Sequence, residues 1–133
     1  MSVHFKKLFV FAILLSLTSC INSKKDPAVQ VISPEQMAND LLEKEEIQLV
    51  DVRTSEEFLE GHLKNAQNIC IASSDFEDKI KLLDKNKPVY LYCRTGVRSS
   101  NAAKTLLKMG FTEVYDMQGG ITNWEEQGLE LAE

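Results

Sequence analysis

The amino-acid sequence predicts an α/β protein built on one parallel sheet with helices on both faces. Helical and strand-like segments alternate from residue 31 to the end of the chain, an order that is typical of parallel sheets. One stretch, residues 88–109, runs from an apolar strand through a short loop into a helix. A chain of 133 residues has room for one small domain with one core.

The first predicted elements are a helix that begins at Ser33 and a strand at 47–52. Ser33 suits the N-cap, Pro34 the first helical position, and Gln36 is placed to complete a capping box. The apolar residues expected on the buried face of this helix are Met37, Leu41 and Leu42.

The middle of the chain predicts two short helices separated by an extended segment. Residues 54–57 repeat the capping-box pattern and open a helix that carries Phe58 and ends near Gly61. Residues 66–71 are extended, and residues 75–83 form an amphipathic helix. The apolar positions of that second helix are Phe76, Ile80, Leu82 and Leu83.

The second half of the chain predicts the central strand and the last two helices. β-Branched and aromatic residues at 88–92 indicate a strand. A helix at 99–109, a strand at 112–116 and a helix at 121–127 follow, the last one after a tight Gly119-Gly120 turn. Trp124 is expected to face the core and anchor the terminal helix.

The loop after the central strand carries the candidate chemistry. A loop between a buried strand and a helix start directs backbone N–H groups inward, and the helix terminus adds partial positive charge, so the loop forms an anion cradle. Cys93 is expected at its rim, where Arg94 and Arg98 favour an ionised thiolate nucleophile. The alternative is a buried cysteine that only ends a strand.

The motif Cys93-Arg94-Thr95-Gly96-Val97-Arg98 resembles the active-site loop of rhodanese-type sulfurtransferases. Residues 50–63 and 114–128 resemble the first and last signatures of that family, in the right order. Lys64-Asn65 departs from the Pro-Gly that usually follows His-Leu there, which alters a turn.

The resemblance implies a rhodanese-like domain at residues 31–133 and sulfur transfer without a cofactor. Cys93 would take the outer sulfur of a small anionic donor such as thiosulfate and pass the persulfide sulfur to cyanide or to a thiol, either a small thiol or a thioredoxin-like protein. The loop amides would stabilise the persulfide, and the arginines would hold the donor. The substrate-binding residues implied are Arg94, Thr95, Gly96, Val97, Arg98 and Ser99.

The same resemblance implies structural roles for three other polar residues. Asp51 and Arg53 lie at the carboxyl end of a strand, and Arg53 is available to pair with Glu56 or Glu57. His62 is expected in a turn or in the core, because a preformed thiolate needs no general base.

Two other functions remain open at this stage. Cysteine phosphatases and arsenate reductases place an arginine six residues after the nucleophile, where this chain has Ser99 and a shorter loop. A persulfide carrier or redox-partner module would use Cys93 without steady-state turnover. Separately, Cys70 is a candidate for a reversible disulfide with Cys93, and the alternative is that Cys70 packs as a small apolar residue.

The N-terminal segment predicts export. Residues 1–19 combine two lysines with a short apolar run, and Leu17-Thr18-Ser19-Cys20 resembles a bacterial lipoprotein signal. That resemblance implies a lipid on Cys20 and a membrane-anchored protein of the cell envelope that faces the periplasm or the exterior. Residues 20–30 are polar and are expected to form a flexible tether.

The composition of the chain argues against nucleic-acid and metal partners. A formal net charge of −5 argues against a nucleic-acid surface, which needs a concentrated basic patch. One histidine remains after the signal segment, without paired Cys or His spacing, so no metal site is expected. We expect a monomer.

Overall fold

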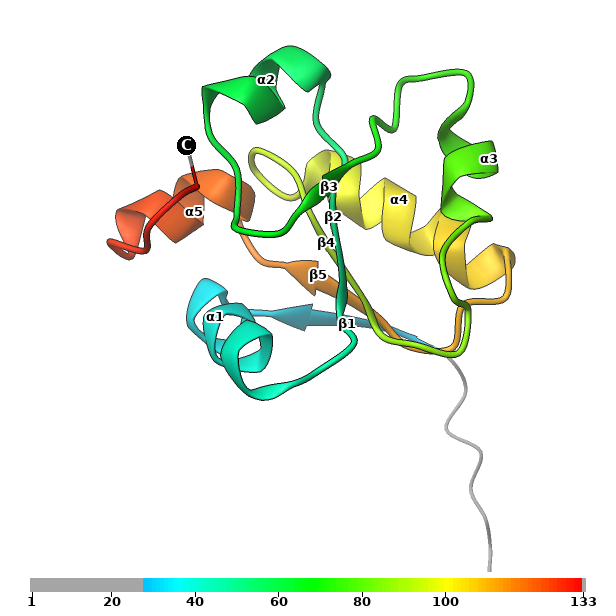
Figure 1. The fold of residues 1–133 in the computed structure, drawn as a ribbon, viewed down its shortest axis with the longest axis horizontal. Coiled ribbons are helices and arrows are strands. Elements are labelled where there is room, and N and C mark those ends of the chain that lie inside the picture. Colours follow the sequence, from blue (N-terminus) through cyan, green and yellow to red (C-terminus); the bar gives the residue numbers. More distant parts are fainter. Residues whose placement is uncertain (1–27, 133) are drawn as a thin grey trace, which may run out of the picture.

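The computed structural model describes residues 28–132 and contains a five-stranded parallel sheet (Figure 1). The strand order is β1-β5-β4-β2-β3, and every neighbouring pair is parallel. The strands are β1 (Val29–Ile32), β2 (Gln48–Asp51), β3 (Gln67–Asn68), β4 (Val89–Tyr92) and β5 (Val114–Met117). The predicted α/β class is therefore confirmed.

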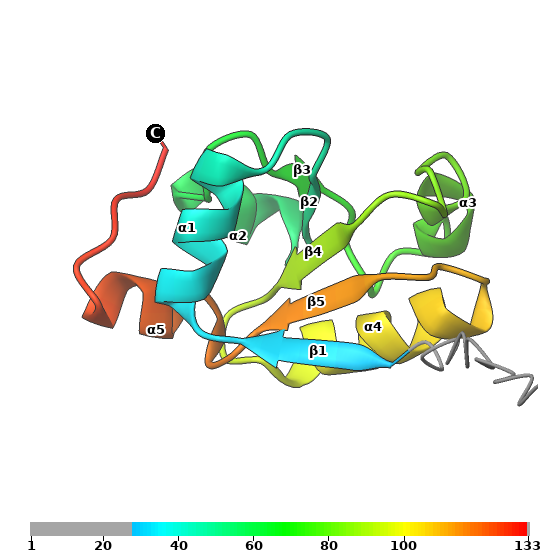
Figure 2. The ribbon, with the colours of Figure 1, turned by 90° about the horizontal axis from the view of Figure 1, so that it is seen from below.

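Within residues 28–132, five helices cover the two faces of this sheet, as Figure 2 shows for α1 and α4 on opposite sides. They are α1 (Pro34–Glu43), α2 (Ser55–Glu60), α3 (Phe76–Ile80), α4 (Val97–Lys108) and α5 (Gly120–Glu126). Leu91 belongs to the core cluster shared with α3 and α4, whereas Tyr90 belongs to the cluster shared with α1 and α5. Alternate residues of the central strand thus face opposite cores.

Capping explains where the early helices begin. Thr54 and Glu57 form the predicted capping box of α2, each side chain bound to the other residue's backbone N–H. At α1, the Ser33 hydroxyl accepts the N–H of Gln36, but the Gln36 side chain donates to Asp40 at 2.8 Å, so that capping box is not completed.

Three local predictions are wrong for identifiable reasons. Leu42 is 86% exposed because Asp40 is buried instead, where it accepts a hydrogen bond from the Tyr90 hydroxyl at 2.6 Å. Leu82 is 85% exposed because α3 ends at Ile80, so its helical periodicity stops before Leu82. Val29 and Gln30, assigned to the tether, pair with β5 in β1.

The remaining N-terminal predictions lie outside the described residues. They are the signal segment 1–19, lipidation of Cys20 and the tether as far as residue 27. Among residues 28–132, the helices are too short or too polar to cross a membrane.

Arg53 forms a buried ion pair, but with a different partner from the predicted one. Its Nη2 lies 2.6 Å from Oδ2 of Asp51 and also donates to the Gly61 carbonyl at 2.7 Å. Both charged side chains are buried. The pair therefore fastens the carboxyl end of β2 to the end of α2, which positions Glu57.

Replacing Asp51 by asparagine is expected to lower the free energy of unfolding by about 3–5 kcal/mol, because the buried Arg53 charge loses its partner. Denaturant unfolding measures this loss. The control Asp78→Asn breaks an exposed pair with Lys81 and is expected to cost less than about 1 kcal/mol. Equal losses in the two variants would contradict a structural role for the buried pair.

Candidate active site

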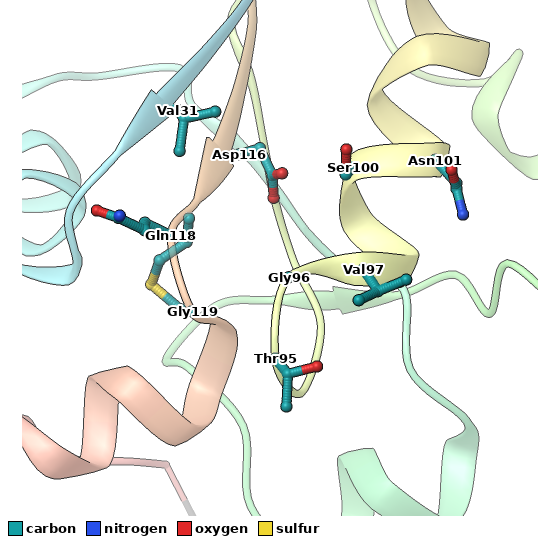
Figure 3. Close-up of a pocket in the computed structure, with 10 residues that line it drawn as sticks. Val31, Thr95, Gly96, Val97, Ser100, Asn101, Asp116, Gln118 and Gly119 are labelled. Atoms are coloured by element: carbon teal, nitrogen blue, oxygen red, sulfur yellow. The ribbon is translucent and has the colours of Figure 1, made fainter.

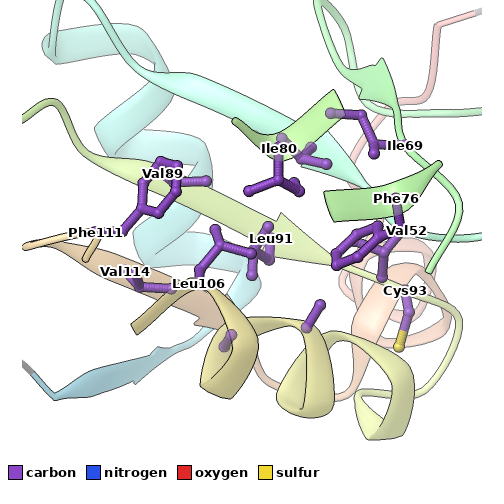
Figure 4. Packing of buried hydrophobic residues seen from close by; sticks show 13 residues of the cluster. Val52, Ile69, Phe76, Ile80, Val89, Leu91, Cys93, Leu106, Phe111 and Val114 are labelled. Carbon is purple, nitrogen blue, oxygen red and sulfur yellow. The ribbon is translucent and has the colours of Figure 1, made fainter. Parts of the chain in front are cut away.

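The candidate nucleophile lies directly after the central strand, where the chain turns into α4. Cys93 follows β4, and Gly96 caps α4 in a left-handed conformation with φ 105°. The N–H of Gly96 donates to Sγ of Cys93 at 3.0 Å, and the Ser99 hydroxyl lies 3.4 Å from the same sulfur. Figure 4 shows this sulfur beside the first turn of α4. Two donors thus point inward at Sγ, as the cradle predicts.

Cys93 is not at the rim of the site, because its exposed fraction is 1%. The side chain points to the face of the sheet that α4 covers, where it joins the core cluster with Val52 and Leu91. The following loop turns over the sulfur. In this conformation the loop therefore separates Cys93 from solvent.

The two arginines of the loop are held together by one carboxylate. Glu57 accepts from Nε of Arg94 at 2.9 Å and from Nη1 and Nη2 of Arg98 at 2.7 and 2.9 Å. The hydrogen bonds from Arg98 hold the pKa of the Glu57 carboxyl well below its usual range, although partial burial opposes this. Glu57 in turn raises the pKa of Arg98.

Glu57 was not predicted as a site residue, and its expected partner, Arg53, pairs with Asp51 instead. The capping box was the only sequence signal, because it fixes Glu57 at the start of α2. That helix follows β2, which is the neighbour of β4 in the sheet. Residues just beyond adjacent parallel strands meet at one edge.

The other loop residues divide between two hollows. Thr95 and Val97 are exposed and line a cavity of about 440 Å³ between the loop and β5 (Figure 3). Arg94 lines a smaller one of about 190 Å³, whose wall also carries Glu57, Glu60 and Glu125. The predicted binding residues are thus contiguous along the chain but do not share one pocket.

The start of α5 holds the backbone of the loop through hydrogen bonds. Ile121 donates its N–H to the Cys93 carbonyl at 2.8 Å, and Thr122 donates to the Arg94 carbonyl at 3.1 Å. A Cβ on Gly120 would lie 2.4 Å from the Arg94 carbonyl oxygen. Only glycine therefore allows the helix to approach the loop this closely.

Asp116 is a buried carboxyl group beside the larger cavity. It is 5% exposed, and its Oδ1 has no hydrogen-bond partner among the described residues. Figure 3 shows it between β5 and the loop. Burial raises the pKa of this carboxyl, although the nearby Ser99 hydroxyl opposes the rise.

Cys70 does not pair with Cys93, since both thiols are free. Cys70 follows β3, which is separated from β4 by β2. Two strand spacings place the backbones about 10 Å apart, beyond the ~7 Å that a disulfide spans. The described conformation therefore does not contain the disulfide, and a reversible bond between the two cysteines stays a prediction. No cluster of potential metal ligands occurs among residues 28–132.

Comparison with known proteins identifies the same stretch of chain. The family model described as rhodanese-like domain matches residues 33–127. The YqhL protein of Bacillus subtilis is 46% identical over 77 residues, which span 58% of this chain and 60% of that relative. The thiosulfate sulfurtransferase GlpE of Coxiella burnetii is 36% identical over 65% of this chain and 78% of its own length. A sulfurtransferase of Allochromatium vinosum is 30% identical over 77% of this chain and 94% of its own length.

Solved structures of rhodanese-like and sulfur transferase proteins have the same fold as this chain. A rhodanese-like domain protein of Staphylococcus aureus superposes with a TM-score of 0.67 and 33% identity, over 78% of this chain and 99% of that one. A polysulfide-sulfur transferase homodimer of Wolinella succinogenes superposes with a TM-score of 0.67 and 32% identity, over 78% of each chain.

Gly120→Ala is expected to destabilise the protein by at least about 2 kcal/mol more than Gly128→Ala, because only the first Cβ meets backbone atoms. Both glycines have positive φ, +61° and +74°, and none of the described atoms lies within 4 Å of a Cβ at Gly128. Denaturant unfolding compares the two variants. Equal losses would contradict the close packing of α5 against the loop.

Asp116→Asn is expected to raise the free energy of unfolding at pH 7 by about 1 kcal/mol or more, since an unpaired buried carboxylate is costly. The raised pKa means that the folded state favours the protonated acid. The native protein is therefore expected to lose stability as pH rises through this pKa. The variant is expected to lack this loss, whereas the exposed Glu126→Gln is expected to keep it. Unfolding at a series of pH values measures the effect, and parallel profiles for the wild type and Asp116→Asn would contradict it.

Proposed function

This chain belongs to the rhodanese-like domain family and is related to sulfurtransferases, and we propose that it transfers sulfane sulfur through a persulfide on Cys93. The observation that carries the proposal is the pair of donors directed at Sγ, the N–H of Gly96 and the hydroxyl of Ser99. Oriented donors of this kind stabilise an ionised sulfur.

The reaction proceeds in two displacements. The Cys93 thiolate attacks the outer sulfur of an anionic donor of the thiosulfate type. An Sγ–S bond forms, the donor's S–S bond breaks, and its electron pair leaves with sulfite. A thiolate acceptor then attacks the outer sulfur of the persulfide and leaves with it, which restores the Cys93 thiolate. Cyanide takes the same sulfur as thiocyanate.

The loop residues divide the work. The backbone at Gly96 and the Ser99 side chain hold the charged sulfur, and the exposed Thr95 and Val97 border the path past the loop. Arg94 and Arg98 bind the oxygen atoms of the donor, a contact for which guanidinium groups are suited. They make this contact as the loop shifts, and Glu57 is the partner that they exchange for the donor.

The location and the acceptor complete the proposal. Lipidation of Cys20 would anchor the protein in the cell envelope, facing the periplasm or the exterior. The acceptor there is a small thiol or a thioredoxin-like protein. Mass spectrometry of the N-terminal peptide from membranes tests the anchor, and an unmodified Cys20 would contradict it.

Cys93→Ser is expected to reduce thiocyanate formation from thiosulfate and cyanide to the rate without enzyme, because no sulfur can be held. The same variant is expected to gain no sulfur atom by mass spectrometry after incubation with thiosulfate. Cys70→Ser is the matched control and is expected to retain both properties, since Cys70 lies in a separate hollow beside α2.

Undiminished thiocyanate formation by Cys93→Ser would overturn the mechanism. A wild-type protein that gains sulfur on Cys93 but shows no steady-state turnover would instead be a persulfide carrier.

A further inference from the structure

The charge at the mouth of the site is lower than its two loop arginines alone would give. Glu57 bridges Arg94 and Arg98 through three hydrogen bonds of 2.7–2.9 Å, which leaves one net positive charge on the three side chains. The nearby Arg53 is already neutralised by Asp51. Two further carboxylates, Glu60 and Glu125, line the hollow beside Arg94.

We propose that Glu57 is a specificity-determining residue that weakens the preference of the site for doubly charged sulfur donors over singly charged ones. This inference rests on the proposed function, because it concerns the donor that binds at the same loop. Organic persulfides and thiosulfonates carry one charge, whereas thiosulfate carries two.

Glu57 is a fixed charge and not a mobile counterion. The capping box holds its Oε2, which accepts the Thr54 N–H at 3.0 Å. The Glu57 side chain is 17% exposed, so solvent screens it only in part. The hydrogen bonds that lower its pKa keep it ionised at all physiological pH values.

A dianionic donor therefore meets an opposing charge that a monoanionic donor meets only half as strongly. Both donors compete with Glu57 for the same guanidinium groups. At about 5 Å and an effective dielectric constant near 20, one additional unit of like-charge repulsion corresponds to a factor of more than roughly one hundred in binding, and solvent screening at this partly exposed site lowers the factor to about ten.

Glu57→Gln is the direct test, because glutamine removes the charge while keeping a side chain that completes a capping box. The donors are thiosulfate and the methanethiosulfonate anion, in which a methyl group replaces one charged oxygen atom. With cyanide as acceptor both give thiocyanate, and the leaving groups are sulfite and methanesulfinate. The quantity measured is the ratio of kcat/KM for thiosulfate to that for methanethiosulfonate.

This ratio is expected to rise about tenfold in Glu57→Gln relative to the wild type. Glu56→Gln is the matched control, since it removes the same charge from the same turn of α2 but faces a different hollow. It is expected to leave the ratio unchanged. An unchanged ratio in Glu57→Gln, with both donors active, would overturn the role of Glu57 and leave the proposed function intact.

A second measurement needs only the wild-type protein and covers the case in which the variant does not fold. Sulfate and methanesulfonate differ by one charge and are tested as competitive inhibitors of the methanethiosulfonate reaction. Sulfate is expected to bind less than ten times more tightly than methanesulfonate, because only one net positive charge faces it. Sulfate binding ten times tighter would overturn the inference. No thiocyanate from either donor with the wild-type protein would overturn the proposed function itself.

Discussion

The site depends on one constraint, which is that the chain after β4 has to turn back over its own cysteine. Gly96 makes this turn possible through its positive φ, and its N–H then points at the sulfur 3.0 Å away. The carbonyl groups on the outer side of the turn need partners of their own. The first turn of α5 supplies them through the N–H groups of Ile121 and Thr122, and Gly120 permits the approach.

This arrangement shields the candidate nucleophile, Cys93, from solvent and directs donors at its sulfur. The thiol is almost fully buried, and the guanidinium groups that flank it are bound to Glu57. The loop is thus held from two sides, by Glu57 of α2 and by the first turn of α5. Because Glu57 contacts both arginines at once, the same hydrogen bonds join α2 to the loop.

The buried polar residues around the site differ in how well their hydrogen bonds and charges are satisfied. Asp51 and Arg53 satisfy each other and fasten α2 beside β2. In the described part of the chain, Asp116 has no such partner on Oδ1, although it lies on β5 next to the central strand. Native proteins break such a rule at functional sites, where local stability is not the only requirement on the sequence.

Short stretches of sequence were enough to predict most of the helices and strands and the candidate loop. The apolar run at 88–92, the glycines of the turns and the capping box at Thr54 identified the elements, because each signal acts within a few residues. The loop motif identified Cys93 in the same way. Such local signals did not predict three features, namely the exposure of Leu42, the pairing of Arg53 and the edge strand β1. They depend on Asp40, Asp51 and β5, which are chosen by packing in three dimensions. The charge at the mouth of the site was also decided there, since residues 57, 94 and 98 meet only when parallel strands bring α2 and the loop to one edge.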